Sequence, residues 1–245
     1  MSATASIPRT ARERARREIT DEITRVAREH LAVGGAASLS LRAVARELGM
    51  VSSAVYRYFP SRDDLLTALI VDAYTSVGAA AQAAERTVPR ADRMGRWLAV
   101  AHAVRAWAKA APHEYGLIFG TPVPGYRAPQ DTIDPAAAVP VLLLELLADA
   151  GAAGRSVAWA GRPIAGEVRR DLAGLRASLS GVVSSPIDDA TAMQGIMAWT
   201  QLIGVISFEL FGHLQNVVSD HDRYFGQQMR NIGLDLGFGS RPAGR

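Results

Sequence analysis

The chain has 245 residues, of which 49% are hydrophobic and 21% are charged, and it contains no cysteine. This balance is typical of a folded soluble protein and argues against disorder, while the lack of cysteine excludes disulfides and thiolate chemistry. The first residues lack the apolar core of a signal peptide, and the apolar run 196–211 is interrupted by Gln201 and Glu209 and is too short to cross a bilayer. We therefore expect a cytoplasmic protein without a membrane partner.

Basic side chains gather at the amino-terminal end. The net charge is only +3, yet residues 1–62 carry 11 basic and 6 acidic side chains, whereas residues 63–245 carry 16 and 18. Five arginines between Arg9 and Arg17 precede Glu18, with only Glu13 among them. A basic end on a near-neutral body favours a polyanionic partner at that end, with a solvated arginine face as the alternative.

Three helices are predicted in the first 59 residues. The first keeps apolar residues at helical spacing and ends at the glycines 34–35, and the second follows a Ser40 cap and stops at Gly49. The third would cover 52–59, with Ser52 as its cap. Two short helices joined by a glycine-containing turn form a helix-turn-helix, which places its second helix in the major groove of DNA. Double-stranded DNA is therefore the first partner to test.

The rest of the chain also has helical periodicity. Pro60 ends the third helix, and Ser61 is expected to cap a long one whose apolar stripe reaches Val77. Because no useful strand pattern follows, further helices are expected near 91–111, 113–119, 136–151, 166–181, 188–215 and 221–236, with an irregular Gly/Pro-rich segment at 120–135. The sequence thus predicts an all-α protein. A helix-turn-helix domain with a basic N-terminal arm would occupy 1–61, and a larger helical domain 62–245.

The last two predicted helices differ from the others in their apolar faces. Helix 188–215 is apolar almost all round and helix 221–236 carries a narrower stripe, so both must be covered. One domain core could absorb both, but we favour an interface between two copies of the chain, because a helix-turn-helix usually requires a dimer. The residues expected at this interface are Met197, Ile203, Ile206, Leu210, Leu214, Phe225, Met229 and Ile232.

The segment from Leu39 to Leu69, LSLRAVARELGMVSSAVYRYFPSRDDLLTAL, resembles the DNA-binding domain of TetR-family (tetracycline-repressor-like) transcriptional regulators. The likeness lies in the Val-Ala-x-x-Leu-Gly run that ends at Gly49, in the Tyr-Phe pair 58–59, and in the Ser-Arg-Asp-Asp-Leu-Leu that starts at Ser61. The resemblance implies an all-helical homodimer with a three-helix DNA-binding head. It also implies a C-terminal domain that binds a small molecule, whose binding releases the operator.

The same resemblance places DNA contacts on the third helix and at flanking positions. Arg57 has the donors to bond guanine O6 and N7, and the Ala54 methyl suits a thymine methyl. The Tyr56 and Tyr58 hydroxyls suit phosphate oxygens, with packing as their alternative role and a phosphate contact as the alternative for Arg57. The full set is Ser40, Arg42, Ser52, Ser53, Ala54, Tyr56, Arg57, Tyr58 and Arg62, while Val44, Ala45, Leu48, Val55 and Phe59 are expected in the core.

A small-molecule site in the C-terminal domain is a further expectation. Aromatic side chains with a few polar groups lie on or just after the central helix and on the long apolar helix, and such a mixture is typical of ligand pockets. The alternative is that these aromatics belong to an ordinary core. The candidates are Trp97, His102, Trp107, Tyr115, Phe119, Trp199 and Glu209, and they favour an apolar or aromatic effector of modest size.

Other classes of function are disfavoured. No HExxH, nucleophile elbow, phosphate loop or Rossmann glycine pattern occurs, so we expect no enzyme activity, no cofactor and no metal. A metal site could be drawn from His213, Asp220, His221 and Asp222, but these residues straddle a helix break, which favours a solvated turn. The preferred function is a repressor of a palindromic operator. A DNA-binding protein without sequence preference, or one that acts constitutively without an effector, remains the alternative.

Overall fold

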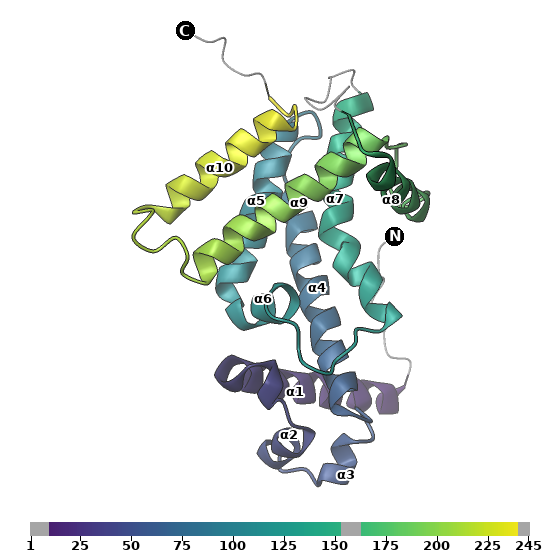
Figure 1. Cartoon of the computed structure of the whole chain (residues 1–245). Coiled ribbons are helices and arrows are strands. Elements are labelled where there is room, and N and C mark those ends of the chain that lie inside the picture. The colour runs from purple at the N-terminus through teal and green to yellow at the C-terminus, as the bar shows by residue number, and fades with distance from the viewer. Residues whose placement is uncertain (1–9, 153–162, 240–245) are drawn as a thin grey trace. The chain divides into compact units, whose positions relative to one another are not determined.

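The structure is a computed structural model that describes residues 10–152 and 163–239, and in that part it is helical without a β-strand (Figure 1). The all-α prediction is therefore confirmed. The chain divides into two compact units, the first formed by residues up to Ala73 with His113–Thr132, and the second by Tyr74–Pro112 with the residues from Ile133 onward. The domain limit expected after residue 61 stays a prediction. The compact units of the structure divide after Ala73. Of the five arginines in the basic N-terminal arm, Arg9 lies outside the described residues, and the other four belong to the first helix.

The first unit contains the predicted helix-turn-helix. Its elements are α1 (Ala11–Gly34), η1 (Ala36–Ser38), α2 (Leu41–Glu47), α3 (Ser52–Val55), the first part of α4 (Arg62–Arg86), most of α6 (Pro112–Phe119) and η2 (Gln130–Thr132). A capping box opens α1, where the Glu13 amide donates to Thr10 Oγ1 at 3.2 Å and the Thr10 amide to Glu13 Oε2 at 3.1 Å. Ser61 caps α4 as predicted, because its hydroxyl accepts from the Asp64 amide at 3.1 Å.

Two other predicted caps are wrong. Ser40 occupies the N-cap position of α2 but its hydroxyl makes no capping hydrogen bond, and α3 begins after Val51 rather than at a Ser52 cap. The third helix is also shorter than expected. After one α-helical turn the chain tightens, with the Arg57 amide donating to Ala54 O at 3.2 Å and the Tyr58 amide to Val55 O at 2.9 Å. Pro60 disfavours helical geometry at Phe59, the residue before it, and so prevents the helix from continuing beyond this turn.

A small apolar core holds these short helices together. Four of the five predicted core residues are buried, and Leu48 is only partly buried. Gly49, with φ +64°, makes the turn between α2 and α3 in a conformation that side chains with a Cβ rarely adopt. The core consists of Ile23, Val26, Ala27, Leu31, Leu41, Val44, Ala45, Val55, Phe59, Leu65, Leu66 and Leu69.

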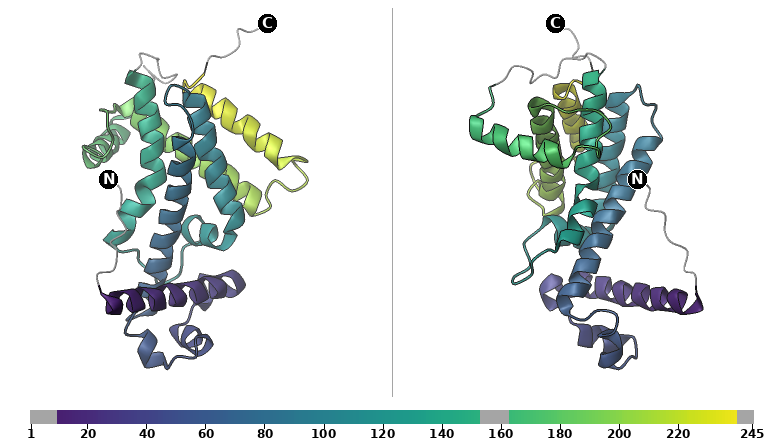
Figure 2. Two further views of the ribbon diagram at one scale, coloured as in Figure 1. Left: turned by 180° about the vertical axis from the view of Figure 1, so that it is seen from behind. Right: turned by 90° about the vertical axis from the view of Figure 1, so that its right-hand side faces the viewer.

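The second unit is a bundle of longer helices. Besides the end of α4 it contains α5 (Arg93–Ala110), α7 (Ile133–Ala152), α8 (Gly166–Ser178), α9 (Asp189–Leu210) and α10 (His221–Asp235), all close to the predicted ranges. Helix α7 begins a few residues earlier than predicted, and the segment before it is irregular except for η2. Helix α9 packs against α5, α7, α8 and α10 and so lies at the centre of this unit (Figures 1 and 2).

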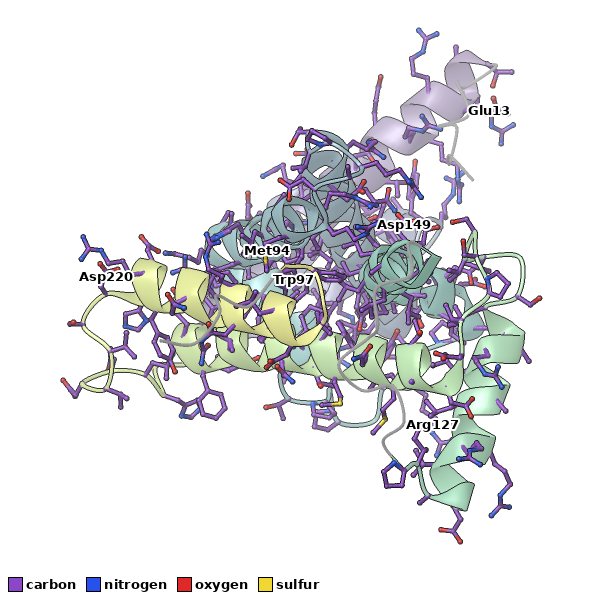
Figure 3. The ribbon with its side chains drawn as sticks, turned by 90° about the horizontal axis from the view of Figure 1, so that it is seen from above. Glu13, Met94, Trp97, Arg127, Asp149 and Asp220 are labelled. Atoms are coloured by element: carbon purple, nitrogen blue, oxygen red, sulfur yellow. The ribbon has the colours of Figure 1, made fainter. Side chains whose placement is uncertain are left out.

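Helices α5 and α10 approach closely around one tryptophan. Trp97 is fully buried, and its indole N–H donates to Met229 O at 2.6 Å. Gly233 permits this approach, because a Cβ there would lie 2.7 Å from Met94 Sδ and 2.8 Å from Trp97 Cδ1. Figure 3 shows Met94 and Trp97 beside α10. The aromatic residue thus fixes the spacing of the two helices.

One described helix, α4, is long and apolar enough to cross a membrane by length and composition alone, with 44% of its apolar window buried. Core helices of soluble proteins have the same composition. Leu65, Leu66 and Leu69 lie in the core of the first unit, and Asp72 forms an ion pair with Arg28 of α1 at 2.7 Å. These contacts fit a core helix.

Candidate DNA-binding interface and interior polar groups

The turn that starts with α3 presents polar side chains on a rigid base. Val55 and Phe59 are buried and anchor the turn in the core. Between them Tyr56 is 41% exposed, Arg57 is exposed and Tyr58 is partly buried. Of the residues before Val55, Ser52 and Ser53 are exposed and Ala54 is partly buried. The geometry thus gives an exposed Ser-Ser and Tyr-Arg surface whose backbone is held by two apolar side chains.

Helix α1 contributes Arg16 to this surface. From the sequence, Arg16 was expected only as one of the arginines of the basic N-terminal end. The Arg16 guanidinium lies 5.2 Å from the centre of the Tyr58 ring and donates to the Arg57 carbonyl at 3.4 Å. A guanidinium over an aromatic face is attracted by the ring quadrupole. No spacing rule could have found this pair, because 41 residues separate Arg16 from Arg57.

Many arginines in the first unit keep their charge uncompensated. Arg25 is paired with Glu22 and Glu29 at 2.6 Å each, and Arg28 with Asp72 and Glu114. Among the described residues of this unit, salt bridges are absent at Arg12, Arg14, Arg16, Arg42, Arg46 and Arg57. Uncompensated arginines around a helix-turn-helix suit the phosphates of a duplex, which release counterions when they are neutralised.

The flanking positions predicted to contact the DNA backbone are not equivalent. Arg42 is exposed, and Ser40 is partly buried with a hydroxyl that makes no capping bond. Arg62 donates to Leu39 O at 3.1 Å and to Ala36 O at 2.6 Å, so its guanidinium holds the connection between α1 and α2. Its phosphate contact stays a prediction, and the structure gives this side chain a second role.

The predicted ligand-binding residues are divided between the two units. Tyr115 and Phe119 belong to the first, where Tyr115 is fully buried and the two ring centres lie 5.0 Å apart. Trp97, His102, Trp107, Trp199 and Glu209 belong to the second. Neither unit by itself therefore brings the whole set together.

Within the second unit, most polar atoms of these candidates already have partners. The Trp97 indole donates to Met229 O, and that of Trp107 to Ser76 Oγ at 3.0 Å. Glu209 accepts two bonds from Arg105, at 2.7 and 2.6 Å. These contacts favour a core role for the three residues, the alternative weighed from the sequence.

His102 lies at the edge of the same region. Its ring meets Phe225 edge-on, with centres 5.3 Å apart, and Arg105 covers that phenyl ring at 4.9 Å. Desolvation, and then the positive charge of Arg105, lower the pKa of His102 below its ordinary value. Both effects favour the neutral form of the His102 ring. Trp199 is partly buried on α9.

Three residues predicted at a subunit interface are instead core residues. Ile206, Phe225 and Met229 are at most 1% exposed within their own chain, so their assignment to an interface is wrong. The reason is that the apolar stripe of α10, with Phe225 and Met229, packs on α5, and that α9, with Ile206, is packed against four other helices. The other five (Met197, Ile203, Leu210, Leu214 and Ile232) are partly buried. The exposed apolar side chains of α9 are Ile196 at 39% and Phe208 at 55%.

A groove of about 640 Å³ runs between α9 and α10. Phe208, Tyr224 and Ile232 are among the residues that line it. Near its end Asp220 caps α10 by accepting from the Arg223 amide at 3.0 Å. Residues 10–152 and 163–239 contain no group of three His, Cys, Asp or Glu side chains placed to hold a metal ion.

Comparison with known proteins agrees with this geometry. Residues 23–69 match the family model of bacterial regulatory proteins of the tetR family, and residues 97–232 match the model of the tetracyclin repressor-like C-terminal domain. The HTH-type transcriptional regulators Rv1816 of Mycobacterium tuberculosis and Mb1846 of Mycobacterium bovis are each 37% identical over 89% of this chain and 92% of their own.

Solved structures show the same fold. The regulatory protein SCO4313 is 35% identical, covers 91% of this chain and 98% of its own, and superposes with a TM-score of 0.70. A tetR-family regulatory protein from Rhodococcus RHA1, 16% identical over 90% of this chain and 98% of its own, has the same fold with a TM-score of 0.61. Members of this family are DNA-binding regulators and not enzymes. The chain belongs to the TetR family of bacterial transcriptional regulators.

Proposed function

We propose that this regulator is a cytoplasmic repressor that binds a palindromic operator as a homodimer and is released by a small apolar or aromatic effector. The observation that carries the DNA-reading part is the exposed Tyr56-Arg57 turn, anchored from below by Val55 and Phe59. Arg57 reads a guanine, the two tyrosines and the serines 52–53 contact phosphates, and Ala54 meets a thymine methyl. Ser40, Arg42 and Arg62 complete the contact surface on the DNA backbone.

Exposed apolar surface on α9 supports the dimer. Ile196 and Phe208 are large apolar side chains of α9 that stay exposed, and Phe208 also lines the groove beside α10. In a twofold-symmetric pair, the same patch of each copy covers the other. Met197, Ile203, Leu210, Leu214 and Ile232 are the residues that this interface would bury further. The two recognition turns would then lie about 34–36 Å apart, or a multiple of that distance, over successive half-sites.

Binding titrations on matched duplexes test the DNA-reading part. The duplexes are an operator selected from genomic fragments and a scrambled version of the same composition, both at fixed salt. Arg57→Ala should cost about 1–3 kcal/mol on the operator and much less on the scrambled duplex, since a bidentate base contact discriminates by that amount. An equal loss on both duplexes would refute base reading by Arg57. Protection of one half-site alone in footprints would refute the palindromic dimer.

The second candidate is a constitutive regulator without an effector. It is favoured by the internal hydrogen bonds of Trp97, Trp107 and Glu209, which leave these groups no spare polar atom facing a ligand. Screening compounds for release of the bound operator separates the two candidates. Release by at least one apolar or aromatic compound supports the effector, whereas a regulator that no compound displaces is constitutive.

A further inference from the structure

One buried polar side chain in the second unit has no partner. Gln194, on α9, is 1% exposed, and neither its Oε1 nor its Nε2 takes part in a hydrogen bond. A carboxamide placed in an apolar interior without partners loses the hydrogen bonds that it makes to water, which opposes folding. Such groups are rare in native proteins and call for an explanation, of which a bound molecule that supplies the missing bonds is one.

The other polar side chains of this unit that are buried as a whole have partners, although single buried atoms of Arg93, His221 and Gln228 have none. Arg96 is held by Glu85 and Asp149, and Arg105 by Glu209. Thr191, one turn before Gln194, hydrogen-bonds Asp188. Figure 3 shows Asp149, the partner of Arg96, on α7. Among the described residues, the interior of the second unit therefore offers one side chain with both a free donor and a free acceptor.

The side chains around Gln194 on α9 are small and, apart from Thr191, apolar. Thr191, Ala192, Gly195 and Ala198 form a stripe of small buried residues on the same part of α9. The neighbouring helix α7 presents leucines here, and a Cβ at position 195 would overlap Leu144. A buried water needs several polar partners to be retained, and among these neighbouring side chains only Thr191 is polar. An organic molecule with an apolar body and one polar edge fits these conditions better.

We propose that the side chain of Gln194 is the polar anchor of the effector, and that the effector carries a hydrogen-bond donor beside an acceptor, as in a carboxamide, a lactam or an un-ionised carboxylic acid. The amide plane of Gln194 pairs with such an edge through two hydrogen bonds, with Nε2 donating and Oε1 accepting. The apolar part of the molecule packs on the small residues of α9. This inference rests on the proposed function, since it names the chemical class of its effector.

The experiment uses the full chain and three probes of similar shape. Benzamide offers a donor and an acceptor, acetophenone only an acceptor, and ethylbenzene neither. Wild type is compared with Gln194→Met, which keeps the length of the side chain, and with Gln82→Met, the same change at an exposed position of α4. Affinities are measured by ligand-observed NMR, and thermal unfolding is followed without probe.

Wild type and Gln82→Met should bind benzamide roughly tenfold more tightly than acetophenone, the effect of one further neutral hydrogen bond with good geometry. Gln194→Met should lose that preference and bind ethylbenzene at least as well as wild type does. Without probe, Gln194→Met should unfold at a higher temperature, because it removes an unpaired buried amide.

Three results would overturn the inference. They are equal binding of benzamide and acetophenone by wild type, an unchanged preference in Gln194→Met, and a lower unfolding temperature of that variant without probe, which would indicate a structural water only. Operator binding is measured separately. If wild type prefers benzamide but no probe releases the operator, the Gln194 contact stands and the proposed effector response is contradicted. If compounds release the operator and Gln194→Met still binds them as wild type does, the effector response stands and the Gln194 contact is contradicted.

Discussion

The two compact units use arginine in opposite ways. In the second unit Arg96 and Arg105 are 2% and 6% exposed, and each is paired with carboxylates from other helices. In the first unit Arg42 and Arg57 are exposed and form no salt bridge among the described residues. The same guanidinium is a structural element where it is desolvated and paired. Where it stays solvated and uncompensated, its charge is available to a polyanion outside the chain.

The largest effect is expected at Arg105, a buried and paired arginine of the second unit. Arg105→Met would leave Glu209, whose side chain is 11% exposed, without its bidentate partner. Removing one member of a buried pair costs about 3–5 kcal/mol, because the other charge stays buried. The free energy of unfolding in urea measures this loss.

The matched control is Arg223→Ala. Its side chain is 91% exposed and pairs with Asp220 at 3.1 Å, so the change should cost about 0.5 kcal/mol or less. Equal costs at Arg105 and Arg223 would show that the buried pair is not structural.

A second prediction concerns the close packing around Trp97. Gly233→Ala would place a methyl group against the indole and Met94, and overpacking of this kind costs about 1–3 kcal/mol. Gly226→Ala, on the same helix, meets no atom within 4 Å. It should raise stability by about 0.5–1 kcal/mol through helix propensity. Thermal unfolding of the two variants should move in opposite directions, and a shared direction would contradict the packing described for α5 and α10.

The third prediction has a sign that depends on pH. Asp188 caps α9 by accepting from the Thr191 amide at 2.8 Å, and its hydrogen bonds to the Thr191 side chain and backbone lower its pKa below the ordinary 3.8. Because the folded-state pKa is depressed, the stabilisation is complete above the ordinary value and is lost as pH falls through the folded value. Asp188→Ala should therefore cost about 1 kcal/mol at neutral pH and less in strong acid.

Asp188→Asn is the control for that titration. An asparagine caps about as well as an aspartate but does not ionise, so its stability relative to alanine should not vary with pH. Urea unfolding of both variants from neutral to acid pH provides the measurement. A pH-independent cost of Asp188→Ala would mean that ionisation does not contribute to the cap.

The smallest effect is expected at Arg16, an exposed arginine of the first unit. Arg16→Ala removes the guanidinium over Tyr58, an exposed contact of about 0.5–1 kcal/mol, and should weaken operator binding by that amount. Arg25→Ala, on the same helix, removes an arginine that is already paired with Glu22 and Glu29. Fluorescence anisotropy at several salt concentrations should show a shallower salt dependence for Arg16→Ala than for Arg25→Ala. A shallower salt dependence for Arg25→Ala than for Arg16→Ala would indicate that the DNA lies against another face of α1.

The helices were predictable from the sequence because their causes are local. Gly35 and Gly49 end helices by adopting backbone conformations that residues with a Cβ rarely adopt, and Ser61 begins one by accepting from an amide three residues on. The tightening after α3 was missed because residues 56–58 include no glycine or proline, the usual sequence signals of a turn. The Ser40 and Ser52 caps failed because composition shows which residue can cap and not which hydroxyl turns toward an amide.

The sequence by itself determined the all-helical class, the helix-turn-helix and the resemblance to a regulator family, since periodicity and short motifs carry that information. Only the tertiary structure decided which apolar stripe is core and which is surface, as Phe225 and Phe208 show by lying on opposite sides of that division. It also decided which polar groups have partners, bringing Arg16 to Tyr58 and Arg105 to Glu209 while leaving Gln194 alone. The physical reason is that burial and hydrogen bonding depend on residues distant in the chain, which no local pattern encodes.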